Sequence, residues 1–79
     1  MKKTIVMPTL KPDMKEGVLC RWNAEEGDSV KKGDVLFEVE TDKVVSEVEA
    51  TEDMKLCRII AEEGDTVAPG GALCEVIEG

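Results

Sequence analysis

The sequence contains no histidine and no tyrosine, and it has one phenylalanine and one tryptophan among its 79 residues. Histidine is a very common metal ligand and general base, so its absence removes the usual centre of zinc and hydrolytic sites. We therefore expect no metal site, no Ser-His-Asp triad and no catalytic residue. Because aromatic residues are scarce, the core of the fold must consist mainly of aliphatic side chains.

Positive charge is also in short supply. The chain has 10 Lys and Arg against 18 Asp and Glu, which gives a net charge of −8. This balance argues against binding to nucleic acid or to an anionic membrane surface, and it suits a protein whose partners present basic patches. No apolar run approaches the length of a membrane span, and we expect no signal or transit peptide at the N-terminus.

Cysteine is sparse and odd in number. Cys20, Cys57 and Cys74 include no pair with metal-ligand spacing. We expect free, buried thiols in a reducing compartment, which is the cytoplasm, or the mitochondrial matrix if the source is eukaryotic. The length predicts one domain over residues 1–79, monomeric in isolation.

The chain repeats itself with an offset of 37 residues, from Leu19 to Leu56. Residues 19–30 match residues 56–67, and both segments contain Ala-Glu-Glu-Gly-Asp. Each half predicts a strand, a Glu-Glu-Gly-Asp turn, a short strand, a second turn and a last strand. In these turns we expect positive φ at the glycines, which are Gly27, Gly33, Gly64 and Gly70.

Two such halves predict an all-β fold: a flattened eight-stranded barrel or sandwich of two quasi-symmetric, four-stranded halves. The first strand is expected at residues 4–7, and a polar loop at residues 8–16. This loop is longer than the usual connection between strands, which favours a functional role over that of a plain connector. The expected core residues are Val6, Leu19, Val30, Leu36, Val39, Val48, Leu56, Ile59, Val67, Leu73 and Val76.

The two halves are joined by Glu40-Thr41-Asp42-Lys43-Val44. The flanking runs, residues 34–39 and 45–50, alternate apolar and mainly acidic residues, which is typical of half-buried strands. Together they predict a hairpin with residues 41–43 at its tip. Because the tip has no glycine, we expect a type I turn. A lysine there stands clear of the domain, at the end opposite both termini. From the hairpin alone, a solvated lysine in an acidic turn is the plainer interpretation.

Nearly the whole chain resembles the lipoyl domains of 2-oxo acid dehydrogenase complexes, of the dihydrolipoyl acyltransferase type. The resemblance rests on Glu-Thr-Asp-Lys between two acidic, valine-rich strands, on the opening Ile-Val-Met-Pro, and on Glu-Glu-Gly-Asp-Ser-Val-Lys-Lys-Gly-Asp in the first half. It implies a flattened eight-stranded barrel with lipoate in amide linkage to Lys43. It also implies that the residues presenting this lysine are Gly27, Glu40, Thr41, Asp42 and Val44.

Three positions depart from the family pattern. Val44 stands in place of an alanine, Met54 in place of a glycine, and Thr51 in place of a proline. The first is expected to affect attachment, and the second to affect the local turn geometry.

The resemblance further implies a non-catalytic carrier that forms part of an acyltransferase. Its lipoyl-lysine arm would move acyl groups and electrons. The implied partners are a lipoate ligase or lipoyl transferase, a thiamine-dependent decarboxylase, an acyltransferase core and a dihydrolipoyl dehydrogenase. Because a swinging arm could reach any decarboxylase, we expect the acidic hairpin and the loop at residues 8–16, lying beside the tip, to choose the partner.

Two alternatives remain open. Residues 52–56, Glu-Asp-Met-Lys-Leu, resemble the attachment motif of biotinyl carrier domains. In that family the motif occupies the central hairpin, whereas Lys55 falls at the start of a half-repeat, so a solvated lysine is the preferred interpretation there. The other alternative is an unmodified acidic β domain that binds a basic partner.

Overall fold

The computed structural model describes residues 2–78, which form eight strands. These residues contain no helix, and therefore none that could cross a membrane. The strands are β1 (Lys2–Val6), β2 (Gly17–Trp22), β3 (Ser29–Val30), β4 (Val35–Thr41), β5 (Val44–Glu49), β6 (Met54–Ile59), β7 (Thr66–Val67) and β8 (Ala72–Glu78).

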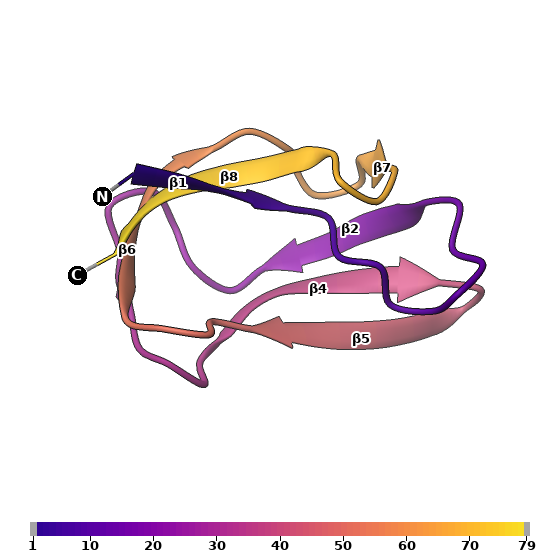
Figure 1. The fold of residues 1–79 in the computed structure, drawn as a ribbon, viewed down its shortest axis with the longest axis horizontal. Coiled ribbons are helices and arrows are strands. Elements are labelled where there is room, and N and C mark those ends of the chain that lie inside the picture. Colours follow the sequence, from indigo (N-terminus) through magenta and orange to yellow (C-terminus); the bar gives the residue numbers. More distant parts are fainter. Residues whose placement is uncertain (1, 79) are drawn as a thin grey trace.

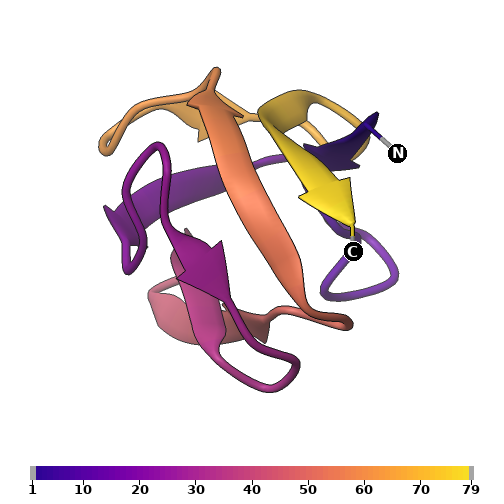
Figure 2. The same cartoon turned by 90° about the vertical axis from the view of Figure 1, so that its left-hand side faces the viewer.

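The strands form two antiparallel sheets of four, in the orders β1-β8-β6-β3 and β5-β4-β2-β7. The body is elongated, with extents of 33 × 20 × 20 Å. A view along the long axis shows the strands of both sheets arranged around a common interior (Figure 2). The two sheets are not joined into a closed barrel, so the fold is the flattened barrel-sandwich that the sequence predicts.

The internal repeat is visible in the topology, with an exchange of strands. The short strand β3 follows β2 in the chain but pairs with β6, and β7 follows β6 but pairs with β2. Each half-repeat therefore contributes two strands to one sheet and one strand to the other. Neither half could complete a four-stranded sheet by itself, and this explains why both must fold together.

The two Glu-Glu-Gly-Asp turns fasten each half to the other in equivalent ways. The N–H of Gly27 donates to the carbonyl of Leu56 at 2.7 Å, and the N–H of Gly64 donates to the carbonyl of Leu19 at 2.7 Å. The two turn glycines have φ of 94° and 95°, in the left-handed region that glycine adopts without steric penalty. The positive φ predicted for the four turn glycines is confirmed.

The core contains most of the residues that the sequence predicts. Leu19, Val30, Leu36, Val39, Leu56, Leu73 and Val76 are buried, and Val48, Ile59 and Val67 are partly buried against them. The prediction for Val6 is wrong, because this side chain is 44% exposed. Ile5 packs against the core and Met7 is buried, so the period-two alternation of this segment places Val6 on the outer face. The buried apolar residues missing from the list of expected core residues are Met7, Met14, Ala24, Phe37, Ala50, Met54 and Ala61, and Cys74 joins them as an expected buried thiol.

The fold separates its two ends. β1 starts and β8 finishes at one end of the long axis, and the β4–β5 turn lies at the other (Figure 1). The segment between β1 and β2 passes beside this turn (Figure 1). The predicted position of the hairpin tip, opposite both termini, is confirmed.

Candidate functional site

The site is the turn of the β4–β5 hairpin. Thr41 pairs with Val44, so the loop between the strands consists of Asp42 and Lys43 alone. Their φ angles are 47° and 66°, both in the left-handed region. This is the pattern of a type I′ turn, and the prediction of a type I turn is wrong. A two-residue hairpin favours type I′ because its twist matches that of the strands, and this requirement overrides the lack of glycine.

A left-handed backbone is unfavourable for lysine by roughly 1–2 kcal/mol, whereas aspartate tolerates it better. The six paired positions between β4 and β5 hold the turn in this conformation. Lys43 is exposed at the end of the molecule. Within residues 2–78, ion pairs form at Lys2 and Lys11 but not at Lys43. The amine of Lys43 is therefore open to a modifying enzyme.

The neighbours of Lys43 differ in their surroundings. Thr41 is buried, and Glu40 is half-buried and pairs with Val45. Val44 is 61% exposed, so the bulk that it adds over alanine is not packed into the core. A shallow hollow of about 260 Å³ lies beside the turn, lined by Glu16, Gly17, Val18, Glu40, Thr41, Asp42 and Lys43.

The loop at residues 8–16 lies against the turn, as the resemblance to lipoyl domains implies. Lys11 forms an ion pair with Asp42. A hollow of about 380 Å³ is formed jointly by the loop and the turn and is lined by Lys11, Asp13, Lys15, Glu16, Thr41 and Asp42. The site therefore comprises the hairpin turn and this loop together.

Gly27 is not brought to the turn. It follows β2, whose last residue, Trp22, pairs with Phe37, six residues before Lys43 along β4. Its N–H is bonded to Leu56 on the other sheet. Its part in presenting the lysine remains a prediction, and any effect would pass through the packing of the two halves.

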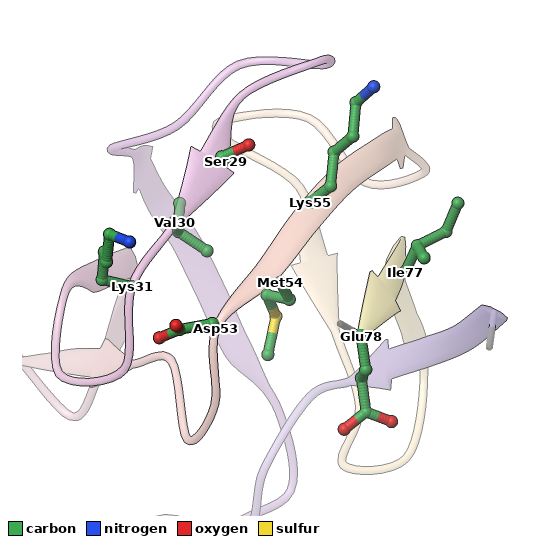
Figure 3. A pocket seen from close by; sticks show the side chains of 8 residues that line it. All are labelled: Ser29, Val30, Lys31, Asp53, Met54, Lys55, Ile77 and Glu78. Atoms are coloured by element: carbon green, nitrogen blue, oxygen red, sulfur yellow. The ribbon is translucent and has the colours of Figure 1, made fainter.

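Lys55 has a different setting from Lys43. It is the second residue of β6, and it pairs with Ser29 on one side and Ile77 on the other. Figure 3 shows its side chain extending from the middle of a sheet, beside Ser29 and Ile77. Met54, which replaces the family's glycine, is buried as the first residue of β6 and is not at positive φ. The expected disturbance of turn geometry at this position is absent.

The three cysteines are free. Cys74 is buried as predicted, and burial raises the pKa of its thiol to about 12. Cys20 and Cys57 are only half-buried. Burial and the charge of Glu40 raise the pKa of the Cys20 thiol. In the part of the chain that the structure describes, no group of three or more Cys, Asp or Glu side chains could hold a metal ion.

Sequence reasoning missed how the loop is held in place. A side chain at Gly17 would place its Cβ 2.7 Å from Val39 Cγ1 and 3.0 Å from Met14 Cε. The gap left by this glycine thus accommodates Met14, which is buried beside the site. The repeat contains the signal, because the equivalent position in the second half is Met54.

Comparisons with known proteins agree with this geometry. A family model described as "Biotin-requiring enzyme", for biotin and lipoyl attachment, matches residues 3–76. The lipoyl domain of the 2-oxoglutarate dehydrogenase complex from Azotobacter vinelandii is 37% identical, with a TM-score of 0.81 over 96% of each chain. A single-chain, multi-domain long-chain acyl-CoA carboxylase shares the fold, at 18% identity and a TM-score of 0.84, over 99% of this chain and 7% of that one.

A dihydrolipoyllysine-residue acetyltransferase component of the pyruvate dehydrogenase complex, from Rhizobium meliloti, is 53% identical over 53 residues. The match covers 67% of this chain and 12% of that protein, so the chain corresponds to a small part of this relative. The family model spans nearly all of the chain, and the Azotobacter domain is similar over almost its full length. The chain therefore belongs to the biotin and lipoyl attachment family and, within it, to the lipoyl domains.

Proposed function

We propose that residues 1–79 act as one lipoyl carrier unit, with lipoate joined by an amide bond to Lys43. The observation that carries this proposal is the position of Lys43 as the second residue of a two-residue type I′ turn, at the end of the molecule away from both termini. An arm attached there leaves the surface freely, while a linker can leave from the opposite end.

The residues around the turn fit such an arm. Lys43 is exposed, and the hollow beside it is shallow and open, so a long substituent meets no obstruction. The paired strands hold the backbone, and Thr41 anchors the turn in the core. When bound, the lipoyl group supplies a dithiolane that carries acyl groups and electrons, and the protein supplies position and recognition.

The proposed partners are those of a 2-oxo acid or acetoin dehydrogenase complex: a lipoate ligase or lipoyl transferase, a thiamine-dependent decarboxylase, an acyltransferase core and a dihydrolipoyl dehydrogenase. The names of the two lipoyl relatives, from pyruvate and 2-oxoglutarate dehydrogenase complexes, support this assignment. The parent protein would then be an acyltransferase. Tethering the arm gives it a high local concentration at each active site.

The hairpin surface indicates a basic partner. Glu38 lies directly across from Glu47 in the β4–β5 pair. Like charges in directly opposed positions destabilise a sheet. Their presence on this face is explained if a basic surface docks there. We place these partners, and the chain, in the cytoplasm or in the mitochondrial matrix, where the three free thiols would stay reduced.

Attachment of biotin at Lys55 is the weaker alternative. Lys55 is exposed, but it sits within a four-stranded sheet and not at a turn. Its backbone is fixed by strands on both sides, so a modifying enzyme would have to approach a flat sheet face.

The test is to incubate the protein with a lipoate ligase, ATP and lipoate, and then to map the modified peptides by mass spectrometry. We expect one lipoyl group, on the peptide that contains Lys43, and none in Lys43→Arg. Modification of Lys55, Lys31 or Lys32 in that variant would contradict the proposal.

A further inference from the structure

The loop at residues 8–16 is anchored at one point in the core. Met14 is 9% exposed, and its side chain occupies the space that a side chain at Gly17 would fill. Met7, from the start of the same connection, also contributes to this contact, with its Cε 3.5 Å from the Cβ position at Gly17. Met7, just before the loop, and Met14, near its end, therefore pack at the same point beside Gly17.

The anchor also shapes the backbone around Lys11. The N–H of Met14 donates to the carbonyl of Lys11 at 3.2 Å, which closes a turn over these four residues. The N–H of Leu10 donates to the sulfur of Met14 at 3.3 Å. Lys11 thus lies in a short closed turn whose base is buried, and its side chain starts from a defined point.

From this point Lys11 reaches across to the hairpin. Its amine pairs with the carboxylate of Asp42, and 34% of the Lys11 side chain is exposed, compared with 75% for Asp42. Asp42 is the residue before Lys43, and both have the left-handed backbone. The ion pair is the contact through which a charged side chain of the loop reaches the two turn residues.

The other half of the repeat lacks this arrangement. Met54 occupies the position equivalent to Gly17, and its own side chain is buried there. At that end the buried methionine thus belongs to the strand itself and not to a loop. The anchored loop is thus specific to the end that carries Lys43.

We propose that Lys11 is a positioning residue for modification of Lys43. Through its ion pair with Asp42, it couples the anchored loop to the attachment turn and reduces the motion of that turn, so that the modifying enzyme meets one presentation of the lysine. This inference rests on the proposed function, because the reaction that it affects is lipoylation.

The experiment compares three variants in the complete chain. Lys11→Met removes the charge and keeps an unbranched side chain, and Lys11→Arg keeps the charge. Lys15→Met is the matched control, because Lys15 is exposed, lines the same hollow and forms no ion pair among residues 2–78. With a lipoate ligase, ATP and lipoate, kcat/KM is expected to fall about two- to fivefold in Lys11→Met, the range of an exposed ion pair. It should stay near the wild-type value in Lys11→Arg and Lys15→Met.

Two further measurements separate positioning from a direct contact with the ligase. In a double-mutant cycle, Asp42→Asn removes the charge but keeps a residue that tolerates the left-handed backbone. The double variant Lys11→Met/Asp42→Asn should then be no slower than the slower single variant. In the unmodified protein, NMR order parameters of residues 42 and 43 should fall in Lys11→Met but not in Lys15→Met.

Any of three results would overturn the role of Lys11: additive losses in the cycle, unchanged order parameters, or a wild-type rate in Lys11→Met. None of them would affect the proposal that Lys43 is lipoylated. If the wild-type chain itself accepts no lipoate, the proposed function fails and this inference fails with it.

Discussion

Truncation of Leu36 tests the account of the core. Its side chain is 2% exposed in β4, the strand that leads to the attachment turn. A buried Leu→Ala change is unfavourable by about 2–5 kcal/mol, from lost burial and the remaining cavity. Scaling by length gives the domain a free energy of unfolding of about 4–12 kcal/mol. Leu36→Ala should therefore remove a large share of the stability, and a loss of about 3 kcal/mol would lower Tm by about 12–24 °C.

The assay is urea unfolding followed by circular dichroism, with two comparison variants. Leu73 is the repeat equivalent of Leu36 and is 0% exposed, so Leu73→Ala should be destabilising in the same range. Val45→Ala removes a side chain that is 52% exposed and should change stability by less than about 1 kcal/mol. An unchanged urea midpoint for Leu36→Ala, or an equal loss in Val45→Ala, would refute the assignment of strand faces.

Three other predictions concern the site and the buried thiol. Exchanging Asp42 and Lys43 moves the amine by one residue within the turn; we expect a large loss of lipoylation with an unchanged circular dichroism spectrum, and normal lipoylation would show that exposure is sufficient. Replacing Asp13 and Lys15 with alanine should leave lipoylation nearly intact but slow reductive acylation by the partner decarboxylase, an effect absent if the loop is only a connector. The pKa of Cys74 rises on folding from 9.0 to about 12, so the folded state holds this proton more tightly. The free energy of unfolding should therefore decrease as the pH rises from about 9 towards 12, more steeply in the wild type than in Cys74→Ala, and equal slopes would contradict the burial of this thiol.

The hairpin and the repeat could be predicted because each produces a recognisable pattern in the amino-acid sequence. Alternation with a period of two locates β4 and β5, and the offset of 37 residues between Leu19 and Leu56 defines the two halves. The turn glycines Gly27 and Gly64 follow from the same pattern. Both the alternation and the repeat can be read from one sequence without knowing which strands pair.

The errors arise where distant contacts decide the outcome. The turn at Asp42 and Lys43 takes the left-handed backbone because both strands are paired up to Thr41 and Val44, which outweighs the preferences of the two residues. Val6 faces outward because its neighbours Ile5 and Met7 take the inward positions, and the alternation alone does not show which of the two faces meets the core.

The packing of Met14 beside Gly17 was missed for the same reason. Met14 packs beside Gly17 next to Val39 of the neighbouring strand β4, and the spacing of Met14 and Gly17 along the chain does not reveal this contact. The Lys11–Asp42 ion pair, between residues far apart in sequence, also emerges only from the folded chain.

The most direct test of the central claim is a paired modification experiment. The unmodified chain is incubated with a lipoate ligase and lipoate, and separately with a biotin ligase and biotin, each with ATP, and both products are mapped by peptide mass spectrometry. The account predicts a single lipoyl group on Lys43 and no biotin on any lysine. Biotin on Lys43 or Lys55, or a chain that accepts neither group, would contradict it.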